Sequence, residues 1–242
     1  MLSKQLILGH RGYSGIAPEN TKLSFEMAYQ FNFDGVELDV HLTKDKELVI
    51  IHDETTNRTS LTSKEIEFTT LADLRKDDHS KFFKFKTQPQ TILTLEEFLD
   101  AYIDKFQVIN VEIKTDQKDY KGIEEKLHKL SEKYGDKYFE KIVFSSFNFQ
   151  TLRNMHKISS KYRLGFLFWT QTQFNSISVT EIKEICEFLN PWWVLYDKDK
   201  EKYKKINLPL MLWTLKDKKK FDEYANDSLV YAQISNYKFE KK

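Results

Sequence analysis

The chain has 242 residues, of which 40% are hydrophobic and 14% aromatic, and its 38 lysines and arginines nearly balance 37 aspartates and glutamates. This balance argues against a nucleic-acid-binding protein, which usually carries a basic excess, and the aromatic content argues against a disordered chain. The single cysteine, Cys186, excludes an internal disulfide framework. Neither a signal peptide nor a run of about 18 apolar residues is seen, which predicts a cytoplasmic protein without stable membrane insertion.

Short apolar runs alternate with amphipathic segments from the start of the chain. A strand at 6–9 precedes a helix at 21–32, with Asn20 or Thr21 as its N-cap, and strands follow at 35–40 and 48–51. Few residues separate the last two strands, which predicts an antiparallel hairpin because a parallel crossover needs about a dozen residues or more. The polar, irregular stretch 53–94 is interpreted as an insertion or long functional loop, not as a separate domain.

The alternation continues to the end of the chain. Helices are predicted at 95–104, 120–133, 149–158, 180–188, near 198–206 and at 218–225. Strands are predicted at 108–113, 142–145, 164–168, 193–196, 210–213 and 230–234. Without the hairpin arm there are eight strands, which favours a (β/α)8 barrel over 1–242. The alternative, an open doubly wound sheet, lacks its usual glycine-rich turn after the first strand.

Acidic residues mark the carboxyl ends of the predicted barrel strands, where the active site of such a barrel lies. Glu37 and Asp39 are two apart and share one face of a strand. Glu112, at the end of the next barrel strand, would join them. Three carboxylates without thiolate or paired histidine ligands suit Mg2+, Ca2+ or Mn2+. The alternative is a network of ion pairs with Arg11 and Lys114 and no metal.

Two histidines accompany these acids. His10 follows the first strand, and His52 lies roughly opposite Asp39 if the hairpin turns at 45–46. Because imidazole titrates near neutral pH, they are candidates for general acid and base. The other histidines are interpreted as surface or loop residues: His41, His79, His128 and His156.

Arg11 and Lys114 supply positive charge beside the acids. With a metal, they would neutralise a phosphoryl group, although a carboxylate substrate would also fit. These residues therefore indicate metal-assisted attack on a phosphate ester or a similar anion. Glu19 and Asn20 lie nearby, in the loop that leads into the helix N-cap. Asn20 could equally orient a substrate or a ligand of the metal.

A series of motifs spans nearly the whole chain. It comprises H-R-G at 10–12, P-E-N-T at 18–21, G-V-E-L-D-V at 35–40, H-D at 52–53, N-R-T at 57–59, E-I-K at 112–114, S-F at 146–147 and W-T at 213–214. In this order the motifs resemble the glycerophosphodiester phosphodiesterase family.

The resemblance implies a (β/α)8 barrel with a small insertion after the second strand and hairpin. It implies hydrolysis of a glycerophosphodiester, such as glycerophosphocholine, to sn-glycerol 3-phosphate and an alcohol, by direct water attack or through a cyclic phosphate. The substrate is a small molecule, no nucleic acid is involved, and the oligomeric state is left open. The implied roles are one Mg2+ or Ca2+, or Mn2+, on Glu37, Asp39 and Glu112, general acid and base chemistry by His10 and His52, and phosphate binding by Arg11 and Lys114.

The last third of the chain departs from the family pattern. Ser235-Asn236 stands where the family often has T-D, and Lys216 stands where an asparagine is usual. These changes bear on substrate fit, for which Glu19, Asn20, Phe147 and Trp213 are the candidate pocket residues. Two alternative functions are a related phospholipase and a non-catalytic binding protein. The phospholipase needs an exposed apolar rim that the Lys-rich sequence does not favour. A non-catalytic protein would have lost an acid or a histidine, and every expected position is filled.

Overall fold

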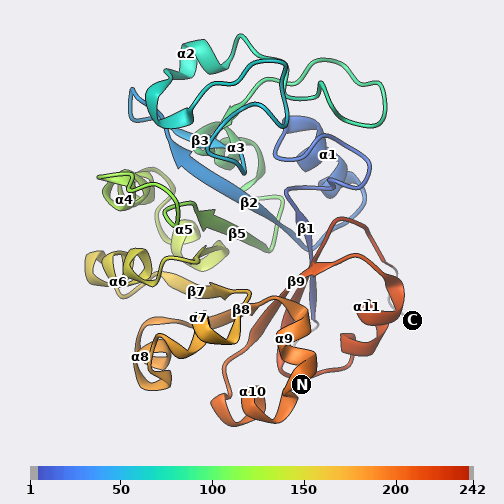
Figure 1. The fold of residues 1–242 in the computed structure, drawn as a ribbon, viewed down its shortest axis with the longest axis vertical. Helices are drawn as coiled ribbons and strands as arrows, with labels where there is room; N and C mark the ends of the chain where they lie inside the picture. The colour runs from blue at the N-terminus through green and yellow to red at the C-terminus, as the bar shows by residue number, and fades with distance from the viewer. Residues whose placement is uncertain (1–4, 240–242) are drawn as a thin grey trace.

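The computed structural model describes residues 5–239. Its central feature is a closed barrel of eight parallel strands in the order β1-β10-β9-β8-β7-β6-β5-β2, closed by pairing of β2 with β1 (Figure 1). The strands are β1 (Leu6–His10), β2 (Gly35–Leu42), β5 (Val108–Ile113), β6 (Ile142–Ser146), β7 (Arg163–Phe168), β8 (Phe188–Pro191), β9 (Leu210–Leu215) and β10 (Val230–Ser235). The predicted (β/α)8 barrel is confirmed.

Helices surround the barrel. They are α1 (Lys22–Gln30), α3 (Leu95–Tyr102), α4 (Ile123–Tyr134), α5 (Asp136–Lys141), α6 (Phe149–Ile158), α7 (Gln171–Asn175), α8 (Val179–Ile185), α9 (Trp193–Lys198), α10 (Lys200–Ile206) and α11 (Lys218–Tyr224). Thr21 caps α1 in a capping box with Ser24, which satisfies backbone N–H groups of the first turn. Within 5–239, no helix has the length and apolar character required to span a bilayer.

A hairpin and an irregular segment extend the sheet beyond β2. Strand β3 (Leu48–Ile50) runs antiparallel to β2, and β4 (Leu93–Thr94) runs antiparallel to β3. Between them lie a 3-10 turn at Ile66–Phe68 and the short helix α2 (Leu71–Leu74). The hairpin register differs by one residue from the prediction, since Ile51, not His52, hydrogen-bonds to the carbonyl of Asp39.

One barrel strand was predicted in the wrong place. Residues 193–196 are helical and belong to α9, whereas the strand is β8, of which only Phe188 falls in a predicted element, the helix at 180–188. The apolar run at 193–196 is short, and periodicity alone does not separate a buried strand from a buried helical turn. Helices α5 and α7 were also not predicted.

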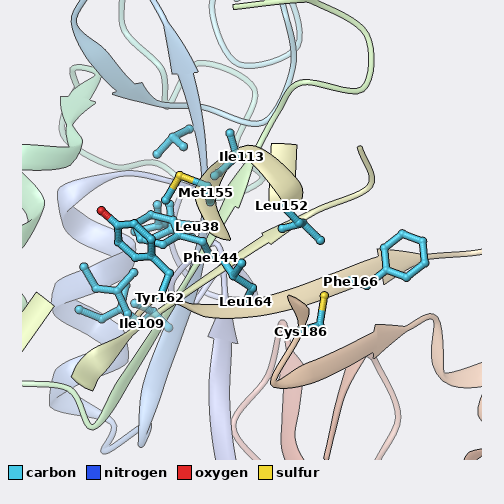
Figure 2. Close-up of a cluster of buried hydrophobic side chains, with 14 of the residues drawn as sticks. Leu38, Ile109, Ile113, Phe144, Leu152, Met155, Tyr162, Leu164, Phe166 and Cys186 are labelled. Carbon is cyan, nitrogen blue, oxygen red and sulfur yellow. The ribbon is translucent and has the colours of Figure 1, made fainter. Parts of the chain in front are cut away.

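Alternation along the strands divides the core into two layers. Outward-facing residues of the strands pack against the helices, as Figure 2 shows for Leu38, Ile109, Phe144 and Leu164 beside Met155 of α6. Residues at the alternate positions fill the barrel itself. This inner cluster comprises Leu6, Leu8, Val108, Val143, Phe188, Met211, Ala232 and Ile234.

Gly35 is required where β1, β2 and β5 approach one another. A Cβ at this position would lie 2.0 Å from the carbonyl oxygen of Val108 and 2.7 Å from Cδ2 of Leu8. We expect Gly35→Ala to lower the free energy of unfolding by about 1–3 kcal/mol or more, because backbone and core must shift to admit the methyl group. Urea denaturation measures this loss, and an unchanged midpoint would contradict the close approach.

Candidate active site

The polar residues predicted from the sequence occupy the last inward positions of three strands. On β1 the inward series ends at His10, on β2 at Glu37 and Asp39, and on β5 at Glu112. The strand registers place His10 beside Glu37, and Asp39 beside Glu112. The alternation that fills the barrel with apolar side chains therefore also delivers these groups to its carboxyl end.

The three carboxylates form one buried cluster. Each of Glu37, Asp39 and Glu112 offers an oxygen within 4.8 Å of the other two. Burial, followed by the charge of Asp39 and Glu112, raises the pKa of Glu37 well above its ordinary value. Burial likewise raises the pKa of Glu112. Desolvated acids at this separation repel one another unless a positive charge lies among them.

Asp39 is the best-compensated member of the cluster. Burial would raise its pKa, but nearby positive charge and a hydrogen bond from Asn20 together hold the pKa below its ordinary range. The largest of these opposing contributions comes from the Arg11 guanidinium, whose Nε lies 3.5 Å from Oδ2. The amide of Asn20 donates to the same oxygen at 2.8 Å. The other oxygen of Asp39, Oδ1, is buried without a hydrogen-bond partner among the described residues.

These contacts bear on the two alternatives left open by the sequence. Both cations do contact acids, since Lys114 Nζ donates to Glu112 Oε1 at 2.7 Å and Arg11 neighbours Asp39. The positive charge of two cations does not neutralise three buried carboxylates. In addition, Asp39 Oδ1 is an acceptor that has no donor among the described residues. The residues therefore fit a hard divalent cation, which takes carboxylate oxygens as ligands.

His10 is held from one side only. Its Nδ1 donates to Asn236 Oδ1 at 2.7 Å, which leaves Nε2 3.9 Å from Glu37 Oε2. Burial and then the charge of Arg11 lower the pKa of His10 to about 3, so the ring is uncharged at neutral pH. From the sequence, Asn236 is only a departure from the family pattern that bears on substrate fit. Its contact arises because β10 closes the barrel against β1.

His52 has a different partner. Its Nδ1 donates to Asp53 Oδ1 at 2.5 Å, and Arg58 Nε donates to the second oxygen of Asp53. The same guanidinium makes two hydrogen bonds to Glu19, at 2.8 and 2.7 Å. Asp53 and Arg58 lie in the H-D and N-R-T motifs, but the sequence predicts no role for them, although the adjacency of His52 and Asp53 is a usable signal.

His41 corrects an expectation. It is not a surface or loop residue but a fully buried residue of β2. Its Nε2 lies 3.0 Å from the carbonyl oxygen of His52, which can only accept, so Nε2 carries the proton. The other ring nitrogen then accepts from the Tyr120 hydroxyl at 2.9 Å. His41 thereby fixes the backbone that carries His52.

A cavity of about 1060 Å3 opens over this cluster. Its polar lining residues include His10, Arg11, Glu19, Glu37, His52, Glu112 and Asn236, and the aromatic ones are Phe147, Trp169 and Trp213. Phe147 and Trp213 meet edge to face at 5.6 Å, and the Trp213 indole donates to the carbonyl of Asn190 at 2.7 Å. Asn20, Asp39 and Lys114 are buried and contact the lining residues instead of lining the cavity themselves.

The cavity brings together fixed positive charge, an acidic cluster that fits a hard cation and two imidazoles at the carboxyl end of a (β/α)8 barrel. Such a combination suits the class of hydrolases that act on phosphate esters. Comparison with known proteins gives the family. Residues 10–235 match the glycerophosphoryl diester phosphodiesterase family, and the chain belongs to it. Its class of enzyme is phosphoric diester hydrolase.

Individual relatives match most or all of the chain. An uncharacterized protein of Mycoplasma genitalium is 58% identical over 242 residues, covering 100% of this chain and 99% of the relative. A glycerophosphodiester phosphodiesterase of Caldanaerobacter subterraneus is 40% identical over 165 residues, covering 68% of this chain and 67% of the relative. An Oleispira antarctica phosphodiesterase, solved with the product sn-glycerol-3-phosphate, shares the fold at 24% identity and a TM-score of 0.76, over 96% of this chain and 93% of that one.

The acid that joins Arg11 to Arg58 gives a pH-dependent prediction. Burial alone would raise the pKa of Glu19. The hydrogen bond from Arg58 and the charge of Arg11 instead lower this pKa from 4.5 to about 2. Because the folded-state pKa is depressed, Glu19 contributes stability that is present above pH 4.5 and is lost as the pH falls towards 2.

We therefore expect Glu19→Gln to be less stable than the wild type at pH 7, by on the order of 3 kcal/mol. The difference should shrink as the pH is lowered from about 4.5 to about 2. Urea denaturation across this range measures it, with Glu132→Gln on the exposed face of α4 as the control. A difference that stays constant with pH would contradict the pairing.

Proposed function

We propose that the protein hydrolyses glycerophosphodiesters, glycerophosphocholine among them, to sn-glycerol 3-phosphate and an alcohol, and that turnover requires a divalent cation. The observation that carries the proposal is the buried trio of carboxylates, with an unpartnered oxygen on Asp39, between two histidines that line one cavity. Family membership supports the substrate class. The product held in the related Oleispira antarctica structure is the product proposed here.

The cation site would be formed by Glu37, Asp39 and Glu112. Mg2+, Ca2+ and Mn2+ all accept carboxylate oxygens. When bound, the cation would neutralise charge on the phosphoryl oxygens as the attacking group approaches. Asn20 and Arg11 would keep Asp39 in its ligand orientation, because both contact its Oδ2.

Phosphate binding is assigned to Arg11 and Lys114. Arg11 lines the cavity, and its guanidinium is oriented by Glu19 and Asp39. Lys114 is buried and bonded to Glu112, so its charge is fixed at the base of the site. A phosphodiester carries one negative charge, and more develops in the transition state. Fixed positive groups therefore stabilise the transition state more than the bound substrate.

His10 and His52 would transfer the two protons. One imidazole removes a proton from the attacking oxygen, which belongs to water or to the neighbouring glycerol hydroxyl, and the other protonates the leaving alkoxide. The two rings are held in place by partners of different charge, a neutral amide at His10 and a carboxylate at His52.

The alcohol would occupy the aromatic side of the cavity. Phe147, Trp169 and Trp213 are the aromatic residues that line the cavity. Aromatic faces attract quaternary ammonium groups, which is why glycerophosphocholine is the substrate proposed for the first assay.

The metal requirement gives a direct prediction. Purified protein treated with chelator should release no glycerol 3-phosphate from glycerophosphocholine, and restoring Mg2+, Ca2+ or Mn2+ should recover release. Glu37→Gln should lower turnover to background with any of these ions, because it removes a charged ligand. Glu132→Gln is the matched control, since this residue is exposed on α4. Full activity in chelator would rule out the cation role.

The histidine environments give a second prediction for turnover. His10→Ala and His52→Ala should each lower kcat by about 10²–10⁴-fold, the usual contribution of a general acid or base. Asn236→Ala should lower kcat with little change in KM, because the His10 ring loses its orienting bond at Nδ1. Asn236→Asp, which keeps an acceptor, should restore part of the activity. Wild-type kcat in either histidine variant would remove that residue from the mechanism.

A further inference from the structure

A compact loop projects from the segment between α2 and β4. Its ends are joined at a narrow base, where His79 N donates to the carbonyl of Gln90 at 2.8 Å. Gln90 N and Ser80 N both donate to Asp78 Oδ1, at 3.0 and 2.9 Å. The Gln90 side chain accepts from Leu23 N at the start of α1, at 3.2 Å. Residues 80–89 thus form a closed loop on a fixed base, which we call the projecting loop.

The projecting loop exposes phenylalanine rings. Its centre reads K-F-F-K-F-K over 81–86. Phe82 and Phe85 are 59% and 57% exposed, whereas most of the chain's phenylalanines are buried. The partly buried Phe83 meets Phe85 edge to face at 5.8 Å, and Lys84 Nζ lies 4.9 Å from the centre of the Phe85 ring. Exposed aromatic side chains gathered in this way mark interaction surfaces.

The charge of the projecting loop is one-sided. Between Asp78 and Glu96 the sequence has no acidic residue, while it has Lys81, Lys84 and Lys86. The chain as a whole carries a net charge of only +1. Elsewhere in the described residues many lysines pair with acids, but none of these three is in an ion pair within 5–239.

We propose that the projecting loop docks the protein reversibly on the surface of an anionic lipid bilayer. Phe82 and Phe85 would enter the headgroup region, and the three lysines would meet lipid phosphates. A protein partner fits less well, because the cores of protein interfaces are depleted in lysine, and here lysines alternate with the exposed rings. The proposal concerns peripheral contact and requires no spanning segment.

Docking would bring the catalytic cavity close to the bilayer. His79, at the base of the loop, contacts Thr59 at 3.0 Å and lines a small pocket together with Glu19 and His52. Glu19 and His52 also line the large cavity. Glycerophosphodiesters are what remains when phospholipids lose their acyl chains, so the enzyme would lie where they are released. The docking itself is inferred from the loop and does not depend on the proposed reaction.

The test uses sedimentation of the full chain with vesicles. Binding is expected to vesicles of phosphatidylglycerol and phosphatidylcholine in equal parts, to weaken as salt is raised, and to be negligible on phosphatidylcholine alone. Phe82→Ser combined with Phe85→Ser should weaken binding by about tenfold or more. Lys81, Lys84 and Lys86 changed together to Gln should have a similar effect. Turnover of a soluble substrate should be unchanged in both variants.

Two controls match these changes in chemistry but lie elsewhere. Phe68→Ser alters a ring that is 63% exposed outside the projecting loop. Lys121, Lys129 and Lys157 changed together to Gln remove the same charge from exposed positions elsewhere in the described chain. Equal loss of binding in the controls and the loop variants would overturn the proposal, as would equal binding to neutral vesicles. Binding of a single-stranded RNA oligonucleotide but not of vesicles would also overturn it.

Discussion

Repulsion among Glu37, Asp39 and Glu112 is the constraint around which the rest of the site is organised. Three desolvated carboxylates in one small space need positive charge and hydrogen-bond donors aimed at them. Arg11 supplies both, because its backbone N–H donates to Glu37 while its guanidinium faces Asp39 and Glu19. It does so with φ at 55°, a left-handed conformation that non-glycine residues seldom adopt. Asn20, the donor to Asp39, has φ at 56°. The strained backbone at both positions is held by contacts to the acids, so the site and its local fold stabilise each other.

Successive residues of the same strands alternate between packing against the helices and facing the barrel interior that leads to the site. Outward positions are mostly apolar and pack the helices against the barrel. Inward positions are apolar at the amino-terminal side of the barrel and become polar towards the cavity. A change on the outer face therefore acts mainly through packing, whereas a change at the end of the inner series acts mainly on charge. Neutral pairs inside the barrel, such as Asn110 with Ser145 at 3.0 Å, separate the apolar layers from the ionised ones. Polarity therefore rises along the barrel interior, and the acids lie next to the cavity, where a cation and a substrate can reach them.

Local patterns in the sequence predicted much of this arrangement. The alternation gave the barrel, the residues two apart on β2 gave the paired acids, and the motifs gave both histidines. Contacts between distant parts of the chain were not accessible in this way. The pairing of His10 with Asn236 depends on barrel closure, and the bonds from Arg58 to Glu19 depend on how the segment after β3 folds over α1. The strand β8 was missed for a different reason: Phe188, Leu189, Asn190 and Pro191 are too few to show a period, and the aromatic run after them is more apolar.

Closure of the barrel by its two terminal strands has a consequence during synthesis on the ribosome. The edge of β1 that pairs with β10 stays without its partner until β10 has been made, and the hydrogen-bond partner of His10 follows 226 residues later in the chain. Until then the nascent chain presents an open sheet edge, a state that favours wrong pairing with other chains. A truncated product lacking β10 would therefore be both inactive and prone to aggregate. Release of a functional enzyme is tied to translation of its last strand.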